Sequence, residues 1–420
     1  MPEPAASPAD GARPAGAAAI LRSTPAIRSR AHALLARARA GNSAWFVVND
    51  GALPNTAALV AEVTTARYPD LKIPYHSRWR HFEAGRVNRL ALLDAALGEV
   101  TPVERAQSQI DLALVSVLLD AGAGPDWKYL EKAATDQAAH AYTRSEGLGV
   151  ASFHAFLGGL FSSHPMLPLR ADAQGLKAIT AARLGVAFQV GPGNPLVGLE
   201  GRAALLRRLG QALEDQPAVF GRPGRPGGLF NHLAAGKDRI AAHDLLTVLL
   251  STLSSIWPAE NSIGGLAMGD CWRHAAAAGP GLTDGWMPFH KLSQWLTYSL
   301  LEPFEWAGIQ VGGLDELTGL PEYRNGGLLL DSGVLRLKDE DLARKSAMAG
   351  DEFIVEWRAL TVALLDELAP LVRAQLGLTA EQMPLACVLE GGTWAAGRVL
   401  AQRLRDGTPP LNITSDGTVF

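Results

Sequence analysis

The sequence is poor in cysteine. Its 420 residues include only Cys271 and Cys387, which are far apart in the chain and form no Cys-x-x-Cys pair. A stabilising framework of disulfides is therefore excluded. This usage is typical of a protein of the reducing cytoplasm.

The chain also lacks an excess of either charge. Its formal net charge is −4 and only 19% of its residues are charged, so no basic field is present that would attract nucleic acid. No basic segment followed by an apolar core opens the chain, and no run of about eighteen apolar residues occurs. We expect a soluble cytoplasmic protein that binds a small molecule, not a nucleic acid or a membrane. A homo-oligomer remains open.

The common cofactor and metal motifs are missing. Gly236-Lys237-Asp238 lacks the upstream glycine and the Ser/Thr of a phosphate-binding loop, and no Gly-x-Gly-x-x-Gly follows a strand. The ten histidines include no His-Glu-x-x-His. No Gly-x-Ser-x-Gly nucleophile motif is present. We therefore expect neither a cofactor nor a metal ion.

What the chain does contain predicts a mainly α fold. Apolar residues recur at helical spacing over 103–120, 202–214, 244–256 and 353–376, whereas strand signals are few and short. Residues 1–18 are mostly Ala, Pro and Gly and predict a disordered tail. Residues 19–420 predict one large α-helical domain. A second arrangement is two lobes with a break near 190–228, where Gly and Pro concentrate.

The segment 313–335 is the densest in chemistry, with four carboxylates, an arginine, a tyrosine and several glycines. Its turn signal at Leu317-Thr-Gly-Leu-Pro321 predicts a helix, a short hairpin and a second helix. Glu322 and Asp331 would face opposite sides of one continuous helix, so they converge only if the hairpin folds one of them back. The alternative is a solvated turn with an acidic helix cap.

A second dense segment, 74–83, contains His76, Arg78, Trp79 and Arg80. The two arginines can clamp a phosphate or a carboxylate, and the tryptophan can stack on a planar group. The alternative is a surface loop tied to the core by its aromatic residues. Two further residues each have two possible roles. Glu146 either caps a helix or faces a pocket, and Cys271 is either a nucleophile or a small buried hydrophobe.

The remaining candidates for catalytic groups are carboxylates in glycine-rich segments. They are Glu316, Glu322, Asp331, Glu390 and Asp416. Glycosidic hydrolysis needs such groups, because one carboxylate activates water or stabilises an oxocarbenium-like sugar while another group assists the leaving atom. The residues alone therefore favour hydrolysis of a glycosidic bond.

Five segments together carry a family resemblance: 74–89, 144–147, 320–335, 390–398 and the terminal Ser-Asp-Gly-Thr-Val-Phe. With them the chain resembles the uracil-catabolism family four proteins of fungi and bacteria, over nearly its full length after the tail. The resemblance implies a role in a pathway that degrades uracil through a ribosyl or nucleotide stage to urea and a three-carbon acid. A phosphoribosyltransferase and a cyclohydrolase-like enzyme are the implied companions.

A fainter resemblance concerns mechanism. Glu322-Tyr323-Arg324 and the leucine-rich run after it are similar to the Asp-Tyr-Arg segment of queuosine-salvage nucleosidases, which are related to helix-hairpin-helix DNA glycosylases. The earlier order, a helix with Asp111 and Asp120 and then Trp127 and Tyr129, also fits. The resemblance implies N-glycosidic hydrolysis at a site on a helical hairpin. Glutamate replaces the aspartate here, so the choice of catalytic carboxylate stays open.

The combined expectation is an N-ribosyl hydrolase that cleaves a ribosylurea-like intermediate, with or without a 5′-phosphate, and releases urea. The catalytic candidates are Glu322, Asp331 and Glu390. The substrate-binding candidates are His76, Arg78, Trp79, Arg80, Trp127, Glu146, Tyr323, Arg324, Trp394, Arg398 and Asp416. The alternatives are a ring-opening amidohydrolase that uses Cys271 or a carboxylate, and a non-catalytic partner that binds nucleotide for other pathway enzymes.

Overall fold

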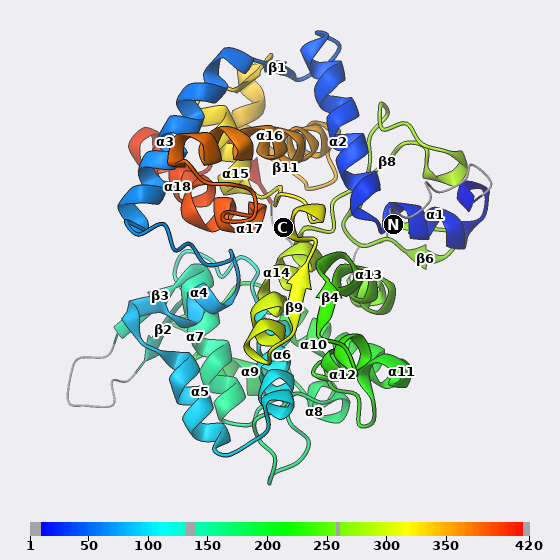
Figure 1. The fold of residues 1–420 in the computed structure, drawn as a ribbon, viewed down its shortest axis with the longest axis vertical. Helices are drawn as coiled ribbons and strands as arrows, with labels where there is room; N and C mark the ends of the chain where they lie inside the picture. The colour runs from blue at the N-terminus through cyan, green and yellow to red at the C-terminus, as the bar shows by residue number, and fades with distance from the viewer. Residues whose placement is uncertain (1–9, 132–139, 258–260, 415–420) are drawn as a thin grey trace. The chain divides into compact units, whose positions relative to one another are not determined.

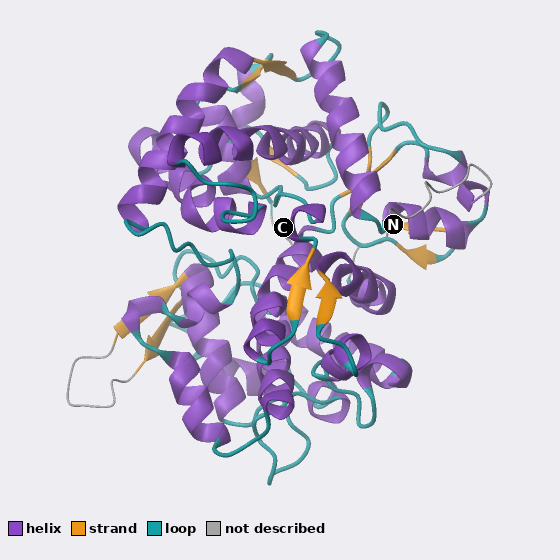
Figure 2. Ribbon diagram, in the orientation of Figure 1, coloured by secondary structure: helices purple, strands orange, loops and turns teal. Residues whose placement is uncertain are grey.

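A computed structural model of the chain describes residues 10–131, 140–257 and 261–414. Helices dominate it, and its strands are only two to four residues long (Figure 2). The expected mainly α fold is confirmed. No helix within the described ranges is both long enough and apolar enough to cross a membrane.

The chain divides into two compact units, and each unit is assembled from segments that are separated in the sequence. Of the described residues, 10–76, 261–294 and 313–414 form the first unit, and 77–131, 140–257 and 295–312 form the second. Helix α14 (Lys291–Trp306) contributes residues to both units. The segment 190–228, where the sequence suggests a break between lobes, lies within the second unit.

The first unit is built around one long helix (Figure 1). Its elements are α1 (Pro14–Leu21), α2 (Thr24–Arg39), β1 (Phe46–Val48), α3 (Leu53–Arg67), β5 (Ser262–Ile263), β6 (Leu266–Ala267), β7 (Cys271–Arg273), β8 (Trp286–Pro288), η6 (Leu314–Glu316), α15 (Tyr323–Asp331), β10 (Leu335–Leu337), β11 (Ser346–Ala347), α16 (Glu352–Leu376), α17 (Leu385–Val388), η8 (Leu389–Thr393), α18 (Trp394–Arg405) and β12 (Asn412–Ile413). Helix α16 packs on both α2 and α3. Its apolar residues are buried along almost its whole length, and it ends at Gly377 in the left-handed conformation that suits a helix terminus.

Part of the segment expected to be a disordered tail is ordered. Residues 10–12 form a turn of 3-10 helix, and α1 begins at Pro14. Ala17, Ala18 and Leu21 are fully or almost fully buried in an apolar cluster with Ile263, Met268, Cys271 and Trp286. Small alanine side chains let this helix approach its neighbours closely, so burial compensates for the ordering entropy that composition alone suggested could not be repaid. Residues 1–9 lie outside the described ranges.

The second unit is also helical. Its elements are α4 (Trp79–Phe82), α5 (Arg89–Leu97), α6 (Pro102–Leu118), β2 (Lys128–Glu131), β3 (His140–Thr143), α7 (Arg144–Leu157), α8 (Ala173–Lys177), α9 (Ala181–Ala187), α10 (Leu199–Asp215), α11 (Pro217–Phe220), α12 (Gly228–Ala234), β4 (Arg239–Ala241), α13 (Ala242–Leu253) and β9 (Gln310–Gly312). Helix α6 starts with a capping box, in which Thr101 and Glu104 satisfy each other's backbone N–H groups. Nearly all its residues after the second turn are buried, so it forms the centre of this unit.

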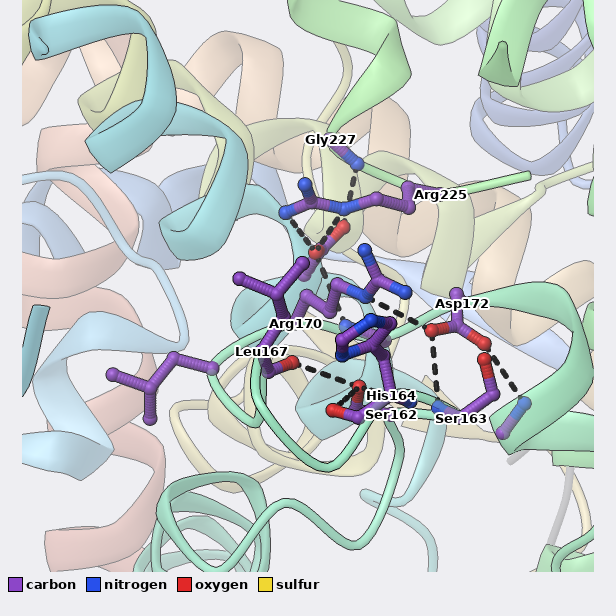
Figure 3. Close-up of polar contacts among 12 residues, drawn as sticks. Ser162, Ser163, His164, Leu167, Arg170, Asp172, Arg225 and Gly227 are labelled. Carbon is purple, nitrogen blue, oxygen red and sulfur yellow. Dashed lines mark hydrogen bonds and ion pairs between the residues drawn. The ribbon is translucent and has the colours of Figure 1, made fainter. Parts of the chain in front are cut away.

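Two buried aspartates hold the loop after α7 in place. Asp172 accepts hydrogen bonds from the backbone N–H groups of Ser163 and Gly175 and from the Arg170 guanidinium, at 2.9–3.0 Å (Figure 3). Asp111 on α6 accepts from Arg225 at 2.7 Å and from the backbone N–H of Gly227 at 2.7 Å. Both carboxylates are fully buried and are satisfied by the protein itself, which indicates a structural role.

Close packing between α15 and α18 depends on a glycine. A Cβ atom at Gly397 would lie 2.2 Å from the backbone oxygen of Arg324. We predict that Gly397→Ala lowers the free energy of unfolding by about 1–3 kcal/mol, because the overlap outweighs the better helix propensity of alanine. Urea denaturation measures the difference. Gln402→Ala, on the exposed side of the same helix, serves as the control and should change stability by less than about 0.5 kcal/mol.

Candidate functional site

Glu322 caps the N-terminus of α15. Its carboxylate accepts hydrogen bonds from the backbone N–H groups of Arg324 at 2.7 Å and Asn325 at 2.5 Å. The Asn325 amide in turn donates to the carbonyl of Leu320 at 3.0 Å and closes the preceding loop. The carboxylate therefore lies at the positive end of a helix dipole, in a fixed orientation.

Helix α16 holds the loop before Glu322 and the start of α15 in place. The Arg358 guanidinium donates to the carbonyl of Pro321 at 3.3 Å, and the Trp357 indole donates to the carbonyl of Gly326 at 3.2 Å. A Cβ atom at Gly319 would lie 2.7 Å from the Leu365 side chain, so this part of the loop lies directly on the helix. The position of Glu322 is thus set by a buried helix and not by the loop alone.

Arg358 also forms a buried, bidentate ion pair with Asp270, at 2.7 and 2.8 Å. Asp270 accepts further hydrogen bonds from the Trp272 indole at 2.7 Å and from the backbone N–H of Lys291 at 2.9 Å. Burial by itself would raise the pKa of Asp270, but the Arg358 charge and these hydrogen bonds lower it to about 2. The pair fixes the start of α14, and with it Lys291, against α16.

Both carboxylate oxygens of Glu390 have partners within this unit. It lies in η8, which is one turn of π-helix inserted between α17 and α18. One carboxylate oxygen accepts from Arg67 at 2.7 Å and from the Tyr68 hydroxyl at 2.9 Å, while the other lies 2.9 Å from His76 Nδ1. Burial would raise the pKa of Glu390, yet the contacts with His76, Arg67 and Tyr68 lower it to about 2.

The π turn packs closely against α3 at Gly392. A Cβ atom at Gly392 would lie 2.4 Å from Thr64 Oγ1 and 2.5 Å from the carbonyl oxygen of Val60, so η8 rests directly on the backbone of α3. This contact brings Glu390 beside Arg67 and Tyr68 at the end of that helix. Single π turns inside α-helices are frequent at functional sites.

Electrostatic interactions connect the two carboxylates. Burial raises the pKa of Glu322, and its two backbone hydrogen bonds limit the rise together with the charges of Lys291 and His76. His76 is therefore hydrogen-bonded to Glu390 and lowers the pKa of Glu322 through its charge. We call Glu322, His76, Glu390 and Lys291 the Glu322 cluster; all four belong to the first unit.

Asp331 does not join this cluster. The hairpin expected within 313–335 is not present in the structure, because strand β9 and the short 3-10 turn η6 precede a single helix, α15. Asp331 is the last residue of that helix, about 13 Å from Glu322 by the helix rise. Its carboxylate pairs with Arg405 at 2.5 Å and is almost fully buried. It joins the end of α15 to the end of α18.

The other candidates near α15 and α18 have separate surroundings. The Arg324 side chain is buried and donates to the carbonyl of Gly407 at 3.2 Å, while the Tyr323 side chain is exposed. Arg398 is exposed and lies over the half-buried ring of Trp394. Asp416 lies outside the described residues.

Most of the candidate substrate-binding residues in the second unit are buried in its core. Arg78 is fully buried, pairs with Asp120 at 3.1 Å and donates to Ser116 at 2.6 Å. The indoles of Trp79 and Trp127 are buried and donate to the carbonyls of Ser299 and Phe188. The two indoles are thus satisfied within the fold, whereas Nη2 of Arg78 is buried without a hydrogen-bond partner in the part of the chain that the structure describes.

Arg80 and Glu146 complete the set in the second unit. Arg80 pairs with Glu302 at 2.7 Å, and Ser77 donates to the same carboxylate at 2.5 Å. Burial raises the pKa of Glu302 to about 7, although Arg80 and Ser77 oppose the rise. Glu146 is exposed in the first turn of α7, a position that suits an acidic residue.

Cys271 has the environment of a small hydrophobe. It is completely buried among apolar side chains of α1 and the β-strands of the first unit. Burial and the neighbouring Asp270 raise the pKa of its thiol well above the ordinary value. A thiolate nucleophile is therefore disfavoured at this position. Within the described residues, no three His, Cys, Asp or Glu side chains are grouped so as to hold a metal ion.

Sequence reasoning missed several members of the site. No local sequence motif marks these residues, and only tertiary packing brings them to the site. They are Arg67, Tyr68, Asp270, Lys291 and Arg358. Glu390, in contrast, is indicated by its residue type and by the paired glycines that follow it.

Comparison with known proteins places the chain in a family. The family model described as "Protein of unknown function (DUF1688)" matches residues 20–420. The chain belongs to this family. It is 41% identical to the protein urg3 of Schizosaccharomyces pombe over 414 residues, which cover 96% of this chain and 98% of that protein. It is 40% identical to uracil catabolism protein 4 of Lachancea kluyveri over 380 residues, which cover 83% of this chain and 85% of that protein.

The low pKa of Glu390 predicts a pH-dependent contribution to stability. The folded-state value of about 2 lies below the usual 4.5, so the contribution is fully present above pH 4.5 and is lost as the pH falls toward 2. We expect Glu390→Gln to reduce the free energy of unfolding by about 3 kcal/mol at pH 7. The difference from the wild type should shrink steadily below pH 4.5 in urea denaturation series.

The exposed Glu340 supplies the matched control. Glu340→Gln should leave stability within about 0.5 kcal/mol of the wild type at both ends of the pH range. A Glu390→Gln deficit that stays constant from pH 7 to pH 3 would contradict the assignment of the effect to the charge.

Proposed function

We propose that this protein is an N-ribosyl hydrolase of uracil catabolism, which cleaves a ribosylurea-like compound and releases urea. The relative from Lachancea kluyveri is named as a uracil catabolism protein, and the similarity extends over most of both chains. The observation that carries the chemistry is the Glu322 carboxylate. It is held at the N-terminus of α15 by two backbone N–H groups, and burial raises its pKa against the opposing charges of Lys291 and His76.

In the proposed reaction, water attacks the anomeric carbon of the ribosyl group as the bond from that carbon to the urea nitrogen breaks. Glu322 accepts a proton from the water, and its negative charge also stabilises the oxocarbenium-like sugar. The departing nitrogen gains one proton. Ribosylurea and water are thereby converted to ribose and urea, with no oxidant or cofactor required.

A carboxylate in this position is suited to act as a base. Burial raises its pKa, which strengthens it as a proton acceptor, while the two backbone hydrogen bonds keep it oriented. The ion pair of Arg358 and Asp270 holds the surrounding loop in one conformation. Rigid support of this kind favours a group that must hold its geometry in the transition state.

The first test is turnover. Purified protein is incubated with ribosylurea and with its 5′-phosphate, with uridine and UMP as comparators, while urea and reducing sugar are measured. We expect equal amounts of urea and of ribose or ribose phosphate from at least one of the first two substrates. Saturable binding of a nucleotide without turnover would favour the non-catalytic partner instead.

The second test is substitution of the proposed base. We predict that Glu322→Gln lowers kcat at least about 100-fold, because the glutamine carbonyl oxygen can still accept from one of the two backbone N–H groups but the side chain cannot accept the proton. Steady-state urea release measures the loss. Asp331→Asn should keep kcat within about threefold, since Asp331 lies at the opposite end of α15.

A further control separates this reaction from the amidohydrolase alternative. Cys271→Ser should also keep kcat close to the wild-type value, because the thiol is buried and protonated. Loss of turnover in a folded Cys271→Ser protein, together with full activity of Glu322→Gln, would overturn the proposal in favour of that alternative.

The pH dependence gives a third test. Glu322 must be ionised to accept a proton, and its pKa is raised, so kcat/KM should fall as the pH drops through a value above the usual 4.5. The acidic limb is measured from about pH 4 to pH 8 with urea release as the readout. An acidic limb below pH 4.5 would argue against Glu322 as the group that titrates.

A further inference from the structure

His76 has a defined orientation that suits proton transfer. Its Nδ1 lies 2.9 Å from Glu390 Oε2. The low pKa of Glu390 means that this carboxylate is ionised at neutral pH and can only accept hydrogen bonds. Nδ1 therefore carries the hydrogen and donates it to Glu390.

The partner carboxylate is itself held on several sides. Its other oxygen accepts from Arg67 and from the Tyr68 hydroxyl, and Arg67 also binds the backbone carbonyls of Glu390 and Gly391. The backbone N–H of His76 donates to the carbonyl of Ala386 at 3.0 Å. Backbone and ring are thus both anchored to the helix that contains the π turn.

Within the described residues, charged and titratable groups from four parts of the first unit act on His76 or on its partner carboxylates. They are Glu390 on η8, Arg67 and Tyr68 at the end of α3, Glu322 at the start of α15 and, through Glu322, Lys291 on α14. The imidazole is hydrogen-bonded to the carboxylate that fixes its tautomer, and its charge lowers the pKa of the carboxylate proposed to activate water. Such an arrangement provides an acid and a base in one site.

We propose that His76 is the general acid of the reaction and that Glu390 is the residue that positions it. This inference rests on the proposed function. Urea is a poor leaving group as an anion, so the departing nitrogen must be protonated as its bond to the sugar breaks. His76 Nε2 supplies that proton while Glu322 takes one from water. Return of the proton from Glu322 to His76 through solvent restores the starting state, and all atoms and charges balance.

The role differs from the one that the sequence suggests for these residues. Glu390 is a catalytic candidate from its residue type, but its oxygens are occupied by Arg67, Tyr68 and His76. It therefore acts on substrate only through His76. His76, in contrast, donates to Glu390 through Nδ1, and we assign the proton transfer to its other ring nitrogen, Nε2.

The test compares two leaving groups. Ribosylurea needs a proton on its leaving nitrogen, whereas 4-nitrophenyl β-ribofuranoside releases a stable phenolate that needs none. The main variant is His76→Asn, because the asparagine amide can still donate to Glu390 although Nε2 is lost. We expect kcat for ribosylurea to fall at least about 100-fold and kcat for the nitrophenyl riboside to change less than about fivefold.

Three further variants separate the roles. Glu322→Gln should slow both substrates, since water must be activated in either case. Glu390→Gln should slow ribosylurea alone and shift the pH dependence of that substrate. His32→Gln is the matched control, because His32 also pairs with a carboxylate, that of Asp366 at 3.1 Å, but lies on the outer part of α2. It should leave both rates unchanged.

A measurement on the free protein complements the kinetics. Nitrogen-15 NMR of histidine should show an Nδ1-bound proton on His76 that is lost in the Glu390→Gln variant. Parallel losses on both substrates in His76→Asn would overturn the acid role while leaving the proposed function intact. Failure of the wild type to release urea from any ribosylurea would overturn the proposed function and the acid role together.

Discussion

The buried ion pair between Asp270 and Arg358 is the interaction on which the rest of the candidate site depends. It joins the loop before β7, the start of α14 and the middle of α16, and Arg358 extends the connection to the carbonyl of Pro321 just before Glu322. Removing one partner of such a pair typically costs about 3–5 kcal/mol, because the other charge is then left buried and uncompensated. The geometry of Glu322 is therefore stabilised by a charge pair that is itself buried.

The two carboxylates of the cluster show how surroundings give one residue type different tasks. Glu390 is surrounded by donors and has its pKa lowered, so it stays ionised and orients a neighbour. Glu322 has only two backbone donors against the effect of burial, and its pKa is raised. A separation of this kind between neighbouring acids is a common basis for assigning distinct roles in an active site.

Local patterns in the sequence predicted the helices well. Apolar periodicity over 103–120, 202–214 and 353–376 corresponds to α6, α10 and α16 within a few residues, because amphipathic spacing is decided by burial on one face. The alternative reading of Glu322 as a helix-capping acid also matches the structure. The prediction of a hairpin within 313–335 was wrong. The turn signal is followed by helix α15, but only a short 3-10 turn precedes it within this segment.

The site could be predicted only in part. Glu322, Glu390 and His76 stand out by residue type, but His76 and Glu390 lie 314 residues apart, and no periodicity indicates that they meet. Their partners Arg67 and Tyr68 end an ordinary helix. The polar residues of segment 74–83 look like ligand contacts, yet Arg78 and Trp79 are needed to satisfy the interior of the second unit. Burial in the tertiary structure decides between these roles.

The π turn at η8 has a consequence for chain length. A π turn contains one residue more than the corresponding α turn, and each residue of an α-helix advances by about 100° around its axis. Deleting a single residue from Leu389–Thr393 would give a regular helix, but it would rotate one half of that helix relative to the other and withdraw the carbonyls that Arg67 binds. The pairing of His76 with Glu390 is therefore sensitive to the length of this segment as well as to its composition. Insertions and deletions should be tolerated far less between Leu385 and Arg405 than helical residues usually allow.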